Sequence, residues 1–148
     1  MLATDHAGFE LKEFVKKMLR RRGYAVKDFG TGSQESCDYP DFIIPCAQAV
    51  AKSKGAAVGI VFGGSGNGEQ MAANKVKGIR AALCYDLQTA VLAREHNDAN
   101  VLSLGSRTVT KNRKLAEKIV LAFLTTPFSN EARHKRRLRK LAAYEKRR

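Results

Sequence analysis

The sequence has no tryptophan, and it contains only three cysteines and three prolines. Cys37, Cys46 and Cys84 are odd in number and lack a C-x-x-C spacing, which argues against a disulfide or zinc framework. No apolar run reaches the ~18 residues of a membrane-spanning helix, and the first residues show no signal-peptide pattern. These absences predict a cytoplasmic protein with reduced thiols and no membrane partner.

Positive charge is concentrated at one end of the chain. The net charge is +13, and residues 133–148 hold nine Lys or Arg against one acidic residue, Glu145. Such a segment attracts phosphate, either along a nucleic-acid backbone or on a sugar phosphate, which needs only two or three arginines. A solvated helix face without a ligand is the third interpretation. Composition alone leaves these three open.

Apolar periodicity predicts strands and helices that alternate along the chain. Strands are expected at residues 1–4, 24–29, 56–62, 79–85 and 100–104. Helices are expected after Gly8 up to Gly23, at 41–54, through 72–75, and at 87–95, 111–124 and 131–147. The alternation predicts an α/β fold, a three-layer αβα sandwich on a mainly parallel, about five-stranded, Rossmann-like sheet. We expect one domain over residues 1–148, with the basic helix at about 131–147 included.

The most informative stretch runs from Gly59 to Lys75 and joins an apolar strand to a helix through a glycine loop. Backbone N–H groups in such a loop can bind an anion. A nucleotide P-loop would need a lysine after Gly68, and the dinucleotide pattern would need a glycine at position 69. Glu69 stands there instead, and its carboxylate would repel a phosphate. We interpret Glu69 as a base that removes a proton from a substrate whose developing negative charge the loop stabilises.

A second polar turn is expected to lie beside this loop. In open parallel sheets, ligands bind beyond the carboxyl ends of the strands, where the strand order reverses. Asp5 and His6 follow the first expected strand, and the glycine loop follows the third. We therefore expect the two turns to face each other across one crevice.

Further candidates lie in other polar segments. His96 follows a helix and precedes a strand, which places it at the amino-terminal side of the sheet or within reach of a neighbouring subunit; a helix-capping role fits it as well as a catalytic one. Arg133 and Arg137 are four residues apart and could grip one phosphate, with Arg107 as a third candidate. The three histidines lack H-x-H or H-E-x-x-H spacing, which disfavours a metal site.

Together these residues resemble the type B ribose-5-phosphate isomerase family of the ribose/galactose isomerase superfamily, which also includes galactose-6-phosphate isomerase subunits. The resemblance covers essentially the whole chain. It is carried, in order, by residues 5–12 (DHAGFELK), 38–40 (DYP), 63–75, 78–81 (GIRA), 94–100, 105–107 (GSR) and 133–134. Each motif is weak alone, but their order and spacing together are specific.

The resemblance implies reversible isomerisation of ribose 5-phosphate and ribulose 5-phosphate through ring opening and a cis-enediolate, without metal, nucleotide or other cofactor. It implies that Glu69 is the base and that His96 assists ring opening. The substrate-binding residues that it implies are Asp5, His6, Tyr39, Gly64, Ser65, Gly66, Asn67, Gly68, Asn97, Arg107, Arg133 and Arg137, with His134 near the phosphate. The family builds each site from two subunits, so a homodimer is implied, and a tetramer is left open.

The sequence departs from the family in two places. Many members use a cysteine at the position of Gly63 as the base, and here no thiol exists there. Residues 63–69 (GGSGNGE) match the subgroup whose base is a glutamate, in agreement with the interpretation of Glu69 from the residues alone. The family usually has several more residues before Asp5, which leaves full pairing of the first strand open.

Three alternatives follow from the same residues. Isomerisation of a six-carbon sugar, galactose 6-phosphate or allose 6-phosphate, would need more room, which several loops set together. A nucleic-acid-binding domain would explain the basic helix but would leave Asp5, Glu69 and His96 without a purpose, so no nucleic-acid partner is expected. A nucleotide-binding module would need the lysine or third glycine that Glu69 displaces.

Overall fold

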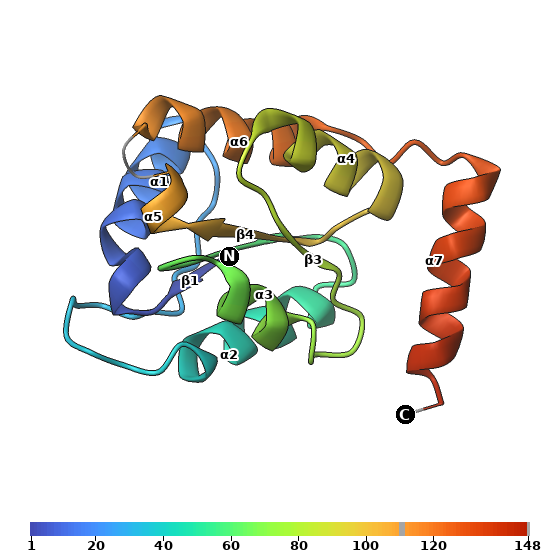
Figure 1. Ribbon diagram of the computed structural model, residues 1–148, viewed down its shortest axis with the longest axis horizontal. Coiled ribbons are helices and arrows are strands. Elements are labelled where there is room, and N and C mark those ends of the chain that lie inside the picture. Colours follow the sequence, from blue (N-terminus) through green and yellow to red (C-terminus); the bar gives the residue numbers. More distant parts are fainter. Residues whose placement is uncertain (110–111, 148) are drawn as a thin grey trace.

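A parallel sheet forms the centre of the computed structural model, which describes residues 1–109 and 112–147 (Figure 1). Its strands are β1 (Leu2–Thr4), β2 (Gly59–Gly63), β3 (Ala81–Leu83) and β4 (Val101–Gly105), in the order β1-β2-β4-β3. All pairings are parallel, and all three residues of β1 pair with β2, from Leu2 with Ile60 to Thr4 with Phe62. The short first strand is therefore fully paired.

Helices cover both faces of the sheet. One face carries α1 (Phe9–Arg21), α4 (Leu87–Asn97) and α6 (Arg113–Thr125), and the other carries α2 (Pro40–Lys52) and α3 (Asn67–Ala73) (Figure 1). Neighbouring strand residues alternate between the two cores, with Ile60 and Phe62 in the first and Val61 in the second. This alternation is what a sheet buried on both faces requires. The predicted three-layer α/β architecture is confirmed.

Local signals place the helix ends. Asp86 caps α4, because its Oδ1 accepts a hydrogen bond from the Thr89 backbone N–H at 2.7 Å. Gly23, with φ of 81°, follows α1 where a left-handed residue is needed. The expected start of a helix at Lys111 lies outside the described residues, and α6 is described from Arg113. Two short elements were not expected, the 3₁₀ turn η1 (His6–Gly8) and α5 (Ser106–Val109).

The second expected strand, residues 24–29, is reduced to one bridge between Leu2 and Asp28, so the sheet has four strands where about five were expected. The segment still runs beside β1, with Leu2 N–H bonded to the Lys27 carbonyl and Phe29 N–H to the Leu2 carbonyl, both at 2.8 Å. The contact continues with Thr4 N–H bonded to the Gly30 carbonyl at 2.7 Å and Thr31 N–H to the Thr4 carbonyl at 2.8 Å, but Gly30, with φ of 103°, interrupts the regular register. Because this segment lies on one side of β1 and β2 on the other, the strand order reverses between β1 and β2.

A buried lysine ties α1 to the loop after that segment. Lys12 is 1% exposed, and its Nζ donates to both carboxylate oxygens of Asp28 at 2.9 and 2.8 Å and to the Thr31 carbonyl at 2.8 Å. Burial alone would raise the pKa of Asp28, but the hydrogen bonds from Lys12 and Lys16 outweigh it and hold that pKa below its usual range. The clamp fixes the start of the loop that carries Cys37 and Tyr39.

The last helix, α7 (Ala132–Glu145), stands at the side of the sandwich (Figure 1). It contacts α4 near its start, and near its end the Glu145 carboxylate accepts a hydrogen bond from Gly78 N–H at 2.9 Å. Between these points, a cavity of about 570 Å³ separates it from the sandwich. Leu141 and Tyr144, which line this cavity, remain 59% and 65% exposed.

Candidate functional site

A glycine loop connects β2 to α3 at the carboxyl end of the sheet. Gly66 precedes α3 with φ of 83°, and a β-carbon on it would lie 2.6 Å from Leu83 and 3.0 Å from the backbone of Gly105. Its carbonyl accepts a hydrogen bond from the Ser103 hydroxyl at 2.7 Å. The loop therefore packs tightly on β4, and only glycine fits at this position. Ser65 and Asn67 are exposed at its tip, where the Asn67 backbone N–H bonds the Ser65 hydroxyl at 3.3 Å.

Glu69 lies in the first turn of α3 and is turned inward. It is 4% exposed, and a β-carbon on Gly63 would overlap its carboxyl group. The glycine at position 63 therefore leaves the space that the carboxylate fills. Burial raises the pKa of Glu69, and the charge of Asp5 raises it further, whereas backbone N–H groups of Glu69 and Gly66 act in the opposite direction. A carboxylate in this state is a better proton acceptor near neutral pH than an exposed one.

Asp5 and His6 lie beside this loop, because β1 and β2 are neighbours in parallel register. The Asp5 carboxylate caps η1, accepting a hydrogen bond from Gly8 N–H at 3.1 Å. The His6 ring lies 3.3 Å, through Nδ1, from both the backbone nitrogen and the carbonyl oxygen of Cys37. The expected convergence of the two polar turns is present.

Two more predicted residues close around the loop. The Tyr39 ring lies 3.0 to 3.3 Å from the point where a β-carbon on Gly68 would project. The Arg107 guanidinium lies 3.0 to 3.3 Å from the equivalent point on Gly64, and its backbone N–H donates to the Gly64 carbonyl at 3.0 Å. The residues that gather here, which we call the loop cluster, are Asp5, His6, Tyr39, Gly64, Ser65, Gly66, Asn67, Gly68, Glu69 and Arg107.

The remaining predicted residues form a second group at the amino-terminal edge of the sheet, where α4 ends. The His96 and His134 rings lie 4.3 Å apart between centroids, at 35° to each other. His134 is 1% exposed, and its Nδ1 lies 2.7 Å from the Ser129 hydroxyl. Burial and the neighbouring His96 lower the pKa of His134. We call His96, Asn97, Arg133, His134 and Arg137 the histidine cluster.

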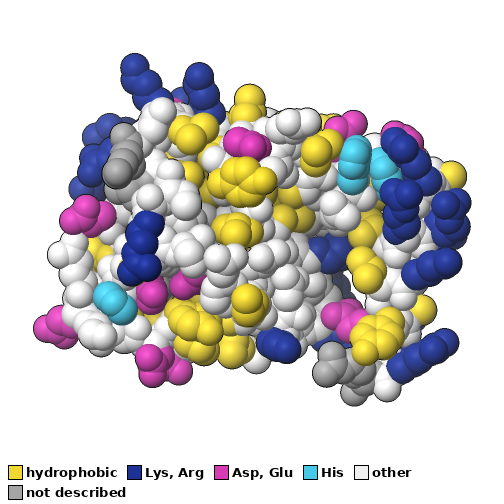
Figure 2. Space-filling view, viewed as in Figure 1, with side chains coloured by type: hydrophobic (Ala, Val, Ile, Leu, Met, Phe, Trp, Pro, Cys, Tyr) yellow, Lys and Arg dark blue, Asp and Glu magenta, His cyan; other side chains and the backbone are white. Residues whose placement is uncertain are grey.

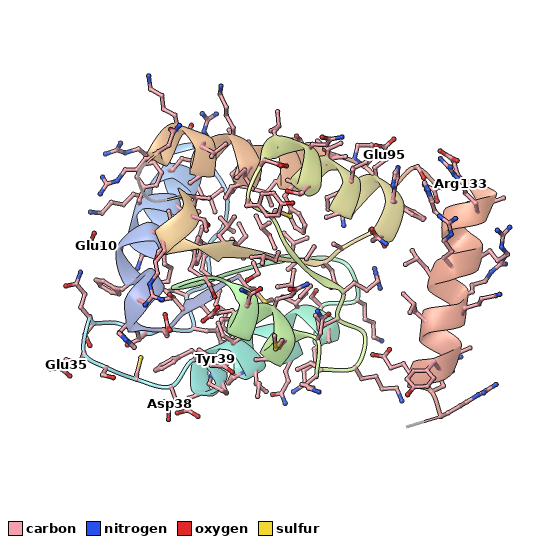
Figure 3. All side chains as sticks on the ribbon, in the orientation of Figure 1. Glu10, Glu35, Asp38, Tyr39, Glu95 and Arg133 are labelled. Carbon is pink, nitrogen blue, oxygen red and sulfur yellow. The ribbon has the colours of Figure 1, made fainter. Side chains whose placement is uncertain are left out.

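The two clusters lie at opposite sides of the molecule. Figure 3 shows Tyr39 beside α2 and Arg133 on α7, with the sandwich between them. The reason is topological: strands of a parallel sheet all point the same way, so residues before β4 and residues after β2 lie at opposite edges. The fold of one chain therefore does not bring His96 to Glu69.

Sequence reasoning missed the residues that hold the loop cluster in place. Lys12 belongs to the 5–12 motif, but the sequence does not predict its structural role, because that role depends on Asp28 and Thr31, which are distant in sequence. The contact of His6 with the Cys37 backbone is likewise visible only in three dimensions. In residues 1–109 and 112–147, no group of three or more His, Cys, Asp or Glu side chains is placed to hold a metal ion. None of the helices in these ranges has the length and apolarity that crossing a bilayer requires.

The sheet, the glycine loop and the buried carboxylate define an α/β protein with a candidate small-molecule site at the carboxyl ends of β1 and β2. Residues 1–141 match the model of the family described as Ribose/Galactose Isomerase. The chain belongs to this family of aldose–ketose isomerases, which confirms the resemblance found in its motifs.

Individual relatives match over nearly the whole chain. Ribose-5-phosphate isomerase B of Mycobacterium tuberculosis is 48% identical over 146 residues, 98% of this chain and 88% of that protein. The solved ribose-5-phosphate isomerase B of Clostridium thermocellum superposes with a TM-score of 0.93 at 45% identity, covering 99% of this chain and 96% of that one. The enzyme from Mycoplasma genitalium, solved with bound ribulose-5-phosphate, gives a TM-score of 0.92 at 42% identity, covering 98% and 94%.

Proposed function

We propose that this protein interconverts ribose 5-phosphate and ribulose 5-phosphate, with Glu69 as the base. The observation that carries the proposal is the buried Glu69 carboxylate beside the glycine loop, next to Asp5. The relatives named ribose-5-phosphate isomerase B, and the one solved with ribulose-5-phosphate, support the choice of a five-carbon substrate. The experiment is to compare kcat/KM for ribose 5-phosphate with that for allose 6-phosphate and galactose 6-phosphate. A preference for either six-carbon sugar would overturn the substrate assignment.

The proposed chemistry needs one base and a set of hydrogen-bond donors. Glu69 removes the proton from C2 of the open-chain aldose, and the electrons of that C–H bond form the C1–C2 double bond of a cis-enediolate. Backbone N–H groups of the glycine loop, with Asp5 and His6, hold the two enediolate oxygens. The N–H groups of Gly66 and Asn67 already bond Glu69 and the Ser65 hydroxyl in this structure. The hydroxyl proton moves from O2 to O1, and protonated Glu69 returns its proton to C1, which gives the ketose. No cofactor takes part in these steps.

We propose that a second subunit completes each site. His96 would open the sugar ring and Asn97 would bind the substrate, but both lie at the far edge of their own sheet. Two-fold pairing would bring the histidine cluster of one chain to the loop cluster of the other. The cavity beneath α7 and the exposed Leu141 and Tyr144 support such an interface, since exposed apolar side chains at a groove mark association surfaces.

The phosphate is proposed to bind Arg107 of the loop cluster together with Arg133 and Arg137 of the histidine cluster. Replacing Arg137 by alanine is expected to raise KM for ribose 5-phosphate about tenfold or more with a smaller change in kcat, because a charge-assisted contact to phosphate is worth roughly 1.5–3 kcal/mol. The matched control is Arg136→Ala, its exposed neighbour on the helix. An unchanged KM with a lowered kcat would contradict the phosphate role.

The pH dependence of the reaction should report the raised pKa of Glu69. The base must be ionised, so kcat/KM is expected to fall as the pH drops through the folded-state pKa. Because burial raises that pKa, the acid limb should lie above the ~4.3 of a free glutamate. A pH profile of kcat/KM between pH 4 and 9 measures it. An acid limb at or below the free value would remove Glu69 from the base role.

A further inference from the structure

A continuous cationic face runs along α7, and its residues neither bind the substrate nor transfer a proton in the proposed reaction. Lys135, Arg136, Arg139 and Lys140 are all exposed, and Lys146 and Arg147 extend the same charge beyond the helix. Figure 2 shows dark blue side chains gathered along the outer side of this helix. We call these six residues the outer basic face.

The outer basic face points away from the rest of the protein. His134, Leu138 and Glu145 occupy the inner side of α7, where His134 is buried and Glu145 bonds Gly78. On a helix of ~3.6 residues per turn, Lys135, Arg136, Arg139 and Lys140 project from the side opposite Leu141. The arginines proposed for the sugar phosphate, Arg133 and Arg137, lie at the edge of this face and are not needed for it.

Nothing within the described residues neutralises this charge. The ion pairs of residues 1–109 and 112–147 include one on α7, between Arg133 and Glu131, and none to the outer basic face. Holding six like charges on one short segment raises the electrostatic free energy of the folded protein. A polyanion would relieve that repulsion and release its own counterions.

Although the sequence predicts no nucleic-acid partner, we propose that the outer basic face binds the phosphate backbone of duplex DNA without reading its sequence. A helix of ~10–12 Å diameter fits the ~12 Å major groove, and side chains four residues apart rise by about 6 Å along it. An anionic membrane fits less well, because an interfacial helix must bury its apolar side in lipid. Here Leu138, Leu141 and Tyr144 face the cavity beside the protein body instead. This inference is independent of the proposed isomerase reaction.

The test measures the affinity of the full-length protein for a mixed-sequence 24-base-pair DNA duplex by fluorescence anisotropy, from 50 to 300 mM salt. Six phosphate contacts predict that log Kd rises with log salt with a slope of about 5. Replacing Lys135, Arg136, Arg139 and Lys140 by glutamine should weaken binding at least 30-fold at 50 mM salt and lower the slope to roughly 2. Circular dichroism and sedimentation should show an unchanged fold and assembly.

The control removes the same charge elsewhere. Lys17, Arg20, Lys114 and Lys118 are exposed on α1 and α6, and their replacement by glutamine should change Kd less than threefold. An equal loss in both variants would show a response to net charge alone and would overturn the proposal. So would the absence of binding at 50 mM salt, tighter binding to a matched RNA duplex, or tighter binding to phosphatidylserine vesicles than to DNA.

Discussion

Replacing Glu69 by glutamine is expected to lower kcat for ribose 5-phosphate by between about 10² and 10⁴, while KM changes less than threefold. The amide keeps the shape and most contacts of the side chain but does not accept a proton from carbon. General-base catalysis contributes a factor of this size, which corresponds to at least ~2.7 kcal/mol of the activation barrier. Steady-state kinetics on the purified variant measure both constants. A variant that kept more than a few per cent of kcat would exclude Glu69 as the base.

The same variant should not be less stable than the parent. Because the folded-state pKa of Glu69 is raised, its ionisation costs stability as the pH rises through that pKa. Glutamine removes this cost, so the Tm at pH 7 is expected to stay equal or to rise. A matched control is Glu35→Gln, which removes an exposed carboxylate from the neighbouring loop and should leave kcat unchanged. A large loss of Tm in Glu69→Gln would show that lost activity reflects lost structure.

Mixing two inactive variants is expected to restore activity. Glu69→Gln disables the loop cluster and His96→Asn disables the histidine cluster, so in the proposed homodimer both sites of each variant are defective. If each site combines Glu69 of one subunit with His96 of the other, a mixed dimer contains one intact site and one doubly defective site. Random exchange of equal amounts makes half of the dimers mixed, which predicts about a quarter of the parental activity.

A site built from one chain alone predicts a different result. Every site of a mixed dimer would then still carry one substitution, and mixing would restore no activity. Subunit exchange must be shown separately, for example by energy transfer between labelled copies, so that a negative result is meaningful. Activity that stays at the level of the separate variants after proven exchange would contradict the shared site.

Much of the fold could be predicted, because the decisive signals are local. The apolar stripe of α1, the Asp86 cap and the glycine loop between β2 and α3 need no knowledge of distant residues. Residues 24–29 carry the composition of a strand, and the chain does hydrogen-bond to Leu2 and Thr4 of β1, but Gly30, with φ of 103°, interrupts the register. Where the backbone leaves a regular register depends on its fit against a distant strand, which a local pattern does not contain.

The candidate site likewise combines features that the sequence predicts with features that depend on the tertiary structure. The placement of Asp5 near Glu69 follows from a general rule for parallel sheets, and the structure bears that placement out. The close fit of the Glu69 carboxyl group against Gly63 was not foreseen, although both residues had been singled out. The clamp of Lys12 on Asp28 and Thr31 was invisible, because each residue alone is typical of a surface.

Proton transfer from a sugar carbon to Glu69 is the central step of the proposed reaction, and solvent exchange measures this step separately from ring opening. Ribulose 5-phosphate has its C5 oxygen blocked by phosphate and does not close to a furanose, so exchange of its C1 hydrogen with D₂O needs no ring opening. By NMR, the parent and His96→Asn should incorporate deuterium at C1, and Glu69→Gln should exchange at least 100-fold more slowly. Exchange in Glu69→Gln at close to the parental rate would contradict the account.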